Sequence, residues 1–102
     1  MPIIYHISTK AEWEKAMENG FYDHPSLHAE GFIHCSQDHQ VAGVMSRYFK
    51  GKTDLVKLTI DTDKLTSKFV FDWSPSSADT FPHIYGRLNM EAVVGVEVVL
   101  SH

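Results

Sequence analysis

The chain has 102 residues, 43% of them hydrophobic and 22% charged, which is typical of one globular domain spanning residues 1–102. A formal net charge of −4, with nine basic residues scattered along the chain, argues against nucleic acid as the main partner. A single cysteine, Cys35, excludes an internal disulfide, and no leader or long apolar run is visible, so we expect a cytoplasmic protein with no membrane partner.

The first half of the chain alternates between predicted strands and helices. Residues 2–8 are rich in Ile and Tyr and predict a strand. Thr9 and Glu12 have the spacing of a capping box, and Gly20 supplies a left-handed stop for the helix that they begin. Residues 21–30 contain Asp-His-Pro-Ser and predict a loop, because a proline disfavours helix just before it.

A strand around His34 comes next and is followed by a second predicted helix. Ser36 is its expected N-cap, with an acidic residue in the first turn. The helical spacing then places four apolar or ring residues on one face: Val41, Val44, Met45 and Tyr48.

The second half of the chain predicts four strands with short connections. We expect strands at 54–60, 68–73, around 83 and at 93–100, a tight turn at 61–65, a loop at 74–80 and a turn of helix at 89–92. The last strand is nearly all β-branched and is predicted to be buried on both faces. Strict βαβ alternation is absent, so the fold class is predicted to be α+β, with a split mixed or antiparallel sheet and two packed helices.

A histidine followed two positions later by a hydroxyl residue recurs in three strand-like places. The pairs are His6 with Ser8, His34 with Ser36, and His83 with Tyr85. Residues i and i+2 of a strand share a face, so these stretches predict one polar site drawn from three strands. The other histidines fall in predicted loop, helix or tail positions and are interpreted as structural: His24, His28, His39 and His102.

Three kinds of function remain open on this pattern. The three histidines could contact a small ligand, could hold a catalytic zinc ion as three protein ligands do in a hydrolase, or could form a binding module without chemistry. We expect no bound zinc, because no carboxylate is placed beside each histidine as a second partner. A glycine-rich phosphate loop is absent from the sequence.

Residues 5–8 (Tyr-His-Ile-Ser), 31–36 (Gly-Phe-Ile-His-Cys-Ser) and 83–86 (His-Ile-Tyr-Gly) closely resemble the signatures of a family known as domain of unknown function 952. The resemblance covers essentially the whole chain. That family is thought to share the fold of ADP-ribosyltransferases, in which a split sheet grips NAD in a cleft. The resemblance therefore implies an ADP-ribosyltransferase-like fold and a small-molecule nucleotide ligand: NAD, ADP-ribose or a relative.

The resemblance also implies roles for individual residues. In those enzymes a histidine followed two residues later by Ser or Thr contacts the ribose of NAD, and His6 and Ser8 match that motif. A ring residue stacks on the nicotinamide, for which His34 lies near the expected place, with Tyr48 and Tyr85 as further candidates.

The third element of those enzymes is a glutamate that binds the ribose 2′-hydroxyl, and His83 stands at its position. An imidazole cannot supply the same negative charge, so glutamate-type ADP-ribosyl transfer is expected to be poor. His83 and His34 would then be the catalytic acid–base groups. A phosphotransferase branch of the same fold dispenses with the glutamate but relies on several arginines, and this chain has Arg47 and Arg87 alone.

Overall fold

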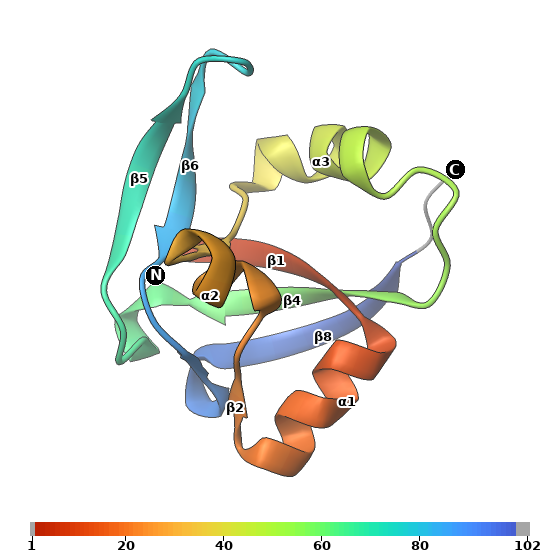
Figure 1. Ribbon diagram of the computed structural model, residues 1–102, viewed down its shortest axis with the longest axis vertical. Coiled ribbons are helices and arrows are strands. Elements are labelled where there is room, and N and C mark those ends of the chain that lie inside the picture. Colours follow the sequence, from red (N-terminus) through yellow and green to blue (C-terminus); the bar gives the residue numbers. More distant parts are fainter. Residues whose placement is uncertain (1, 100–102) are drawn as a thin grey trace.

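The computed structural model describes residues 2–99, which form small antiparallel sheets with helices around them (Figure 1). The largest sheet has the order β1-β4-β8 and consists of β1 (Ile3–Thr9), β4 (Leu55–Asp61) and β8 (Val93–Val99). A second has the order β3-β6-β5 and consists of β3 (Ile33–His34), β6 (Asp79–Ile84) and β5 (Phe69–Ser74). The third pairs β2 (Phe21–Tyr22) with β7 (Leu88–Asn89). The prediction of an α+β fold with two main helices is confirmed, and the sheets are antiparallel rather than mixed.

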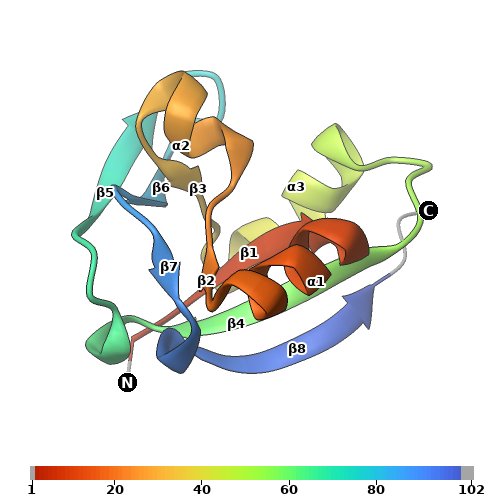
Figure 2. The same cartoon turned by 60° about the horizontal axis from the view of Figure 1, so that its bottom comes forward.

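Helix α1 (Lys10–Asn19) begins as its sequence predicts. The Thr9 side chain accepts a hydrogen bond from the Glu12 N–H at 3.1 Å, and the Glu12 carboxylate accepts one from the Thr9 N–H at 3.1 Å. Gly20 ends the helix with a φ of 83°, a conformation that glycine adopts without strain. This helix lies across the β1-β4-β8 sheet (Figure 2) and buries Trp13 and Ala16.

Replacing Thr9 by Ala should lower the free energy of unfolding by about 1 kcal/mol, because the Glu12 N–H loses its acceptor. Urea denaturation followed by circular dichroism measures the change. Thr53→Ala is the matched control, since Thr53 is exposed and lies outside any helix or strand. Equal losses in the two variants would show that the cap contributes nothing.

The prediction of a loop at residues 21–30 is wrong. Strand β2 and helix α2 (Pro25–Glu30) occupy most of this segment. His24 is the N-cap of α2, and its Nδ1 accepts a hydrogen bond from the Ser26 N–H at 3.1 Å. Pro25 fits because proline disfavours helix before it but is favoured at the first helical position, where no N–H is needed.

The predicted capping role of Ser36 is also wrong. Ser36 is buried, and its backbone exchanges two hydrogen bonds with Tyr5, at 2.8 and 2.7 Å, on the edge of β1. A 3₁₀ turn, Asp38–Gln40, follows with Gln37 as its N-cap, and it leads into α3 (Val41–Tyr48). Ser36 therefore pairs with the edge of β1 through its backbone instead of capping the helix as its local sequence had predicted.

The last strand differs from its prediction in burial. Val94, Val96 and Val98 are 49%, 48% and 60% exposed. Helix α1 packs against β1 and β4, and β8 lies beyond them on the far side of β4, so its β-branched side chains are not enclosed on both faces. Leu100, the predicted end of this strand, lies outside the described residues.

The connections between strands follow the prediction closely. Short 3₁₀ turns lie at Thr62–Lys64 and Met90–Ala92, where tight turns were expected. The loop expected at 74–80 is narrower, because β5 continues to Ser74 and β6 already begins at Asp79. Within residues 2–99, no helix has both the length and the apolar character that a membrane crossing needs.

Candidate functional site

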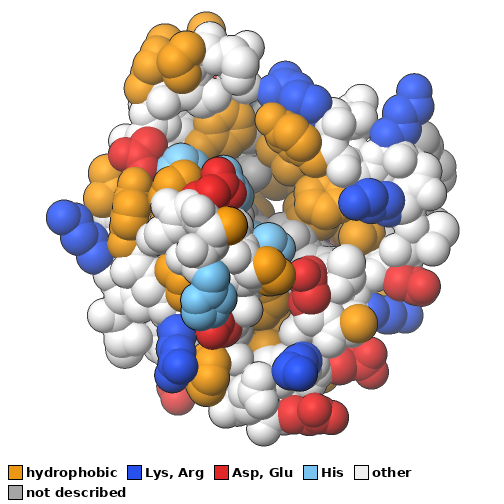
Figure 3. Space-filling view, viewed as in Figure 1, with side chains coloured by type: hydrophobic (Ala, Val, Ile, Leu, Met, Phe, Trp, Pro, Cys, Tyr) orange, Lys and Arg blue, Asp and Glu red, His pale blue; other side chains and the backbone are white. Residues whose placement is uncertain are grey.

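A cavity of about 600 Å³ lies between β1, α3 and the β5–β6 hairpin. Figure 3 shows the molecule hollowed between the hairpin and α3, with apolar, histidine and acidic side chains around the hollow. Three of its sides come from segments far apart in the sequence. Its lining includes four histidines, four aromatic residues, a glutamate and a serine: His6, His24, His34, His83, Tyr48, Phe49, Trp73, Phe81, Glu30 and Ser77. The predicted meeting of His6, His34 and His83 in one cavity is therefore found.

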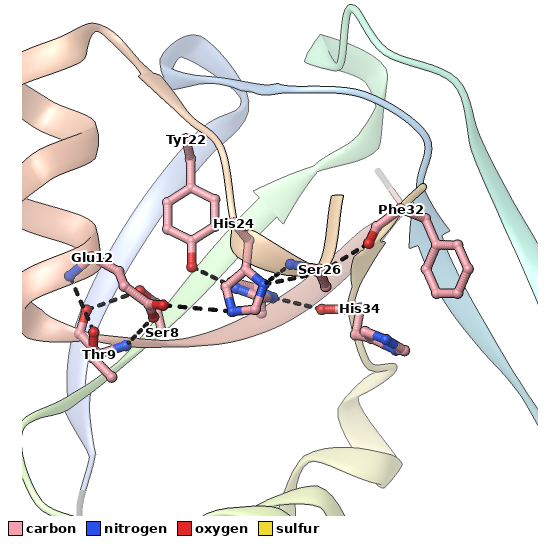
Figure 4. A network of polar contacts seen from close by, with 9 residues as sticks. Ser8, Thr9, Glu12, Tyr22, His24, Ser26, Phe32 and His34 are labelled. Atoms are coloured by element: carbon pink, nitrogen blue, oxygen red, sulfur yellow. Dashed lines mark hydrogen bonds and ion pairs between the residues drawn. The ribbon is translucent and has the colours of Figure 1, made fainter. Parts of the chain in front are cut away.

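His6 lines the cavity but is almost fully buried, and its ring joins β1 to β2 and β3 (Figure 4). Its Nδ1 donates a hydrogen bond to the backbone carbonyl of His34 at 2.5 Å, since a carbonyl oxygen can only accept. Its Nε2 therefore carries the lone pair and accepts from the Tyr22 hydroxyl at 2.9 Å. Burial lowers the pKa of His6 to about 4. Because both ring nitrogens have protein partners, His6 positions β3, and its contact with a ribose stays a prediction.

His24 belongs to the site although it was interpreted from the sequence as structural. Its ring stacks on Tyr22, with centroids 6.0 Å apart, and meets the His6 ring edge-on at 5.3 Å. Its Nε2 lies 3.7 Å from a carboxylate oxygen of Glu12, which links α1 to the start of α2 (Figure 4). Burial lowers the pKa of His24. The sequence offered a signal for it, since Ser26 follows His24 two positions later as in the other three pairs, but the segment was interpreted as a loop because of Pro25.

Two imidazole–carboxylate pairs lie side by side at the cavity. His34 Nε2 is 2.8 Å from a carboxylate oxygen of Glu30, and His83 Nδ1 is 2.8 Å from one of Asp72. His34 and His83 are direct partners across β3 and β6, and their ring centroids are 5.1 Å apart. Phe32 stacks on His83 at 4.1 Å between centroids. Neighbouring strands thus bring together residues that are 49 positions apart in the chain.

Asp72 is held by two donors. The Tyr85 hydroxyl and His83 Nδ1 both reach the same carboxylate oxygen. The hydrogen bond from Tyr85, followed by that from His83, lowers the pKa of Asp72, and the same contact raises the pKa of Tyr85. The carboxylate therefore stays ionised and fixes the orientation of the His83 ring.

The remaining predicted site residues divide into two groups. Tyr48 lines the cavity from α3. Ser8 and Tyr85 are not among the lining residues: Ser8 is buried and donates to the carbonyl of Thr9 at 2.9 Å, and Tyr85 acts through Asp72. Their predicted contact with a cofactor stays a prediction.

The apolar face predicted for the second helix forms one wall of the cavity instead of a core contact. No residue of α3 is buried, and Val44 and Tyr48 line the cavity together with Phe49, the C-cap of the helix. Trp73 and Phe81 line the cavity from the hairpin, and the pairing of Trp73 with Thr80 and of Phe81 with Asp72 places them on opposite faces of its two strands. The sequence predicted the apolar face of this helix, but nothing in it indicated that the face would line a cavity instead of packing in the core.

The three predicted histidines do not form a metal site. Across residues 2–99, no three His, Cys, Asp or Glu side chains converge closely enough to hold a metal ion. Both nitrogens of His6 are already occupied, and His34 and His83 each use one nitrogen on a carboxylate. The zinc-dependent hydrolase therefore lacks a donor set in this part of the chain.

The solved structures that are similar to this chain include those of CC0527 from Caulobacter crescentus. Its X-ray structure is similar to this chain with a TM-score of 0.87 and 28% identity, over 95% of this chain and 85% of that one. Its solution NMR structure gives a TM-score of 0.82 and 29% identity, over 97% and 85%. A comparison with curated proteins gives no match.

The family model described as "Protein of unknown function (DUF952)" matches residues 7–96. These residues include β3 and β6, which carry His34 and His83, and α2, which carries Glu30, together with α3 and the β5–β6 hairpin; His6 lies one residue before the match. The match spans most of the chain, so the resemblance expected from the sequence signatures is confirmed: the protein belongs to the DUF952 family.

Proposed function

We propose that the cavity binds a nucleotide or a nucleotide fragment of the NAD or ADP-ribose class. The observation that carries the proposal is the set of four aromatic residues that line the cavity, Tyr48 and Phe49 from α3 and its C-cap, and Trp73 and Phe81 from the hairpin. Trp73 is 63% exposed and Tyr48 60% exposed, although both belong to one hollow. A flat heteroaromatic ring placed there would stack on side chains that are otherwise left to water.

The polar groups of the cavity suit the rest of such a ligand. Glu30 and His34 offer an acceptor and an imidazole to sugar hydroxyls. At the rim, the Arg47 guanidinium donates to the Ser77 hydroxyl at 2.7 Å and lies 5.9 Å from the Tyr48 ring centroid. Arg47 thus contacts one lining residue on α3, Tyr48, and one in the hairpin turn, Ser77. A phosphate bound at this end of the cavity would accept hydrogen bonds from the planar guanidinium group.

The size of the cavity is consistent with this ligand class. A volume of about 600 Å³ falls within the range of small-molecule sites, which is about 300–1,000 Å³. The proposal concerns binding, and it holds for a module without chemistry as well as for an enzyme. Glutamate-type ADP-ribosyl transfer is expected to be poor, because the one glutamate that lines the cavity, Glu30, is engaged by His34.

Isothermal titration calorimetry with NAD, ADP-ribose, AMP and nicotinamide tests the proposal. At least one of them should bind, and Trp73→Ala should weaken its binding about 5- to 150-fold, since stacking of one base contributes about 1–3 kcal/mol. Phe71→Ala is the matched control: Phe71 is an exposed ring on the same face of β5 but does not line the cavity. Absence of binding by all four at millimolar concentration, or an equal loss in both variants, would refute the proposal.

A further inference from the structure

The two histidines at the cavity are each anchored through one nitrogen. Asp72 accepts from Nδ1 of His83, so the lone pair of the neutral ring lies on Nε2, for which no hydrogen bond is found within residues 2–99. Glu30 engages Nε2 of His34, and no side-chain hydrogen bond to the Nδ1 of His34 is found in the same range. A carboxylate that accepts a hydrogen bond from one nitrogen of an imidazole fixes the tautomer and the orientation of the ring, so that the other nitrogen is free to act on a ligand. The histidine of a Ser-His-Asp triad is held in the same way.

The two rings are also placed to act on one bound molecule. They face each other across paired strands at an angle of 79°, with centroids 5.1 Å apart. Both line the same cavity. A neutral imidazole accepts a proton and an imidazolium donates one, so two rings at this spacing can serve the two halves of a hydrolysis.

Resting on the proposed function, we propose that His83 and His34 are the base and the acid of a site that hydrolyses a nucleoside phosphodiester. His83 is assigned as the base because its side chain is only 14% exposed and Asp72, which holds it, is fixed by a second donor, Tyr85. His34 is assigned as the acid because its side chain is 52% exposed and can exchange protons with water. Arg47 at the rim supplies the charge that a phosphate needs.

The step balances without a metal ion or a second substrate. Water attacks phosphorus, a P–O bond forms, and the water proton passes to Nε2 of His83. The bond from phosphorus to the leaving oxygen breaks, and protonated His34 gives its proton to that oxygen. The products are a phosphate monoester and an alcohol, and proton exchange with water restores both rings. A cyclic diester keeps both products in one nucleotide, which suits a cavity of about 600 Å³.

Asp72 and Glu30 are positioning residues in this scheme, since each acts through its histidine. The titratable groups that face the pair come from several elements. They are Glu30 from α2, Asp72 from β5, Tyr85 after β6, and His6 and His24, whose charges interact with His34. Replacing Asp72 by Asn should therefore change the pH profile of the reaction as well as its rate.

The experiment uses 2′,3′-cyclic AMP, with product measured by phosphorus NMR between pH 5 and 9. We expect a bell-shaped dependence of kcat/KM on pH, and a loss of about 10²-fold or more in His83→Ala and in His34→Ala. The matched control is His39→Ala, because His39 also pairs with a carboxylate, Asp79 at 3.0 Å, but does not line the cavity. Its rate should equal that of the wild type.

Calorimetry with the same cyclic nucleotide and thermal unfolding are measured on every variant, so that loss of binding or of folding is not mistaken for loss of chemistry. If the wild type binds the nucleotide without hydrolysing it faster than buffer, the inference is wrong and the proposed function stands. Hydrolysis that survives in folded His83→Ala also overturns the inference. If no nucleotide binds at all, both fail.

Discussion

Lowering the pH from 7 to 4 should reduce the free energy of unfolding by up to about 3 kcal/mol through His6 alone. Burial holds the pKa of His6 in the folded protein at about 4, against 6.5 for an exposed histidine. Between these two values the unfolded chain binds a proton that the folded protein does not. The stabilisation is therefore complete above about pH 6.5 and is lost as the pH falls toward 4, at about 1.4 kcal/mol per pH unit.

The hydrogen bonds of His6 explain why its neutral form is required. Nδ1 donates to the His34 carbonyl and Nε2 accepts from Tyr22, so a second ring proton would remove the acceptor for the Tyr22 hydroxyl. Burial also lowers the pKa of His24, which adds to the same trend. The acid sensitivity thus arises in the network that joins β1, β2 and β3 at the cavity.

Urea denaturation at pH 4, 5, 6, 7 and 8 measures the effect in the wild type and in His6→Asn. The Asn amide can replace the Nδ1 donor but does not titrate, so its free energy of unfolding should be about 1–3 kcal/mol lower at pH 7 and should vary less with pH. The carboxylates Asp72 and Asp79, whose pKa values are lowered by hydrogen bonds, also destabilise the fold at low pH. Their contribution is common to both proteins and cancels in the difference. Parallel pH curves would show that His6 is not the group responsible.

Local signals in the sequence predicted the elements whose ends are fixed by their own residues. The capping box of Thr9 and Glu12 and the left-handed Gly20 define α1 without help from the rest of the chain. The alternation in β4 likewise identified its buried side chains, Leu58 among them. In these places local preference and tertiary packing agree.

The errors fall where a distant partner decides. Ser36 is a residue type typical of helix N-caps, but its backbone forms hydrogen bonds with Tyr5 at the edge of β1. The β-branched run of β8 is typical of a central strand, but the strand lies at an edge. Neither neighbour can be inferred from nearby residues, because pairing and strand order are long-range properties.

Three histidines of the candidate site were predicted from the sequence, but the fourth, His24, and the carboxylate partners were not. The repeated spacing in three strands predicted that His6, His34 and His83 open into one cavity beside Ser8 and Tyr85; the three histidines do line one cavity, but Ser8 and Tyr85 do not. Nothing in the sequence indicated that Glu30 and Asp72 would pair with these histidines, because an acidic residue on a short helix or an edge strand usually faces water. Only the pairing of β5 with β6 places Asp72 beside His83.

Leu58→Ala should lower the free energy of unfolding by about 2–5 kcal/mol, whereas Val96→Ala should lower it by less than about 1 kcal/mol. The two residues are direct partners across β4 and β8 and share one face of the sheet. Leu58 is 0% exposed in the central strand and its truncation leaves a cavity in the core.

Val96 is 48% exposed, so most of what its truncation removes is already in contact with water. Urea denaturation of both variants at several protein concentrations measures the difference. A loss in Val96→Ala as large as that in Leu58→Ala would mean that something covers this face of β8 in solution. If that loss also grew with protein concentration, the cover would be a second copy of the chain, because only an association equilibrium makes stability depend on concentration.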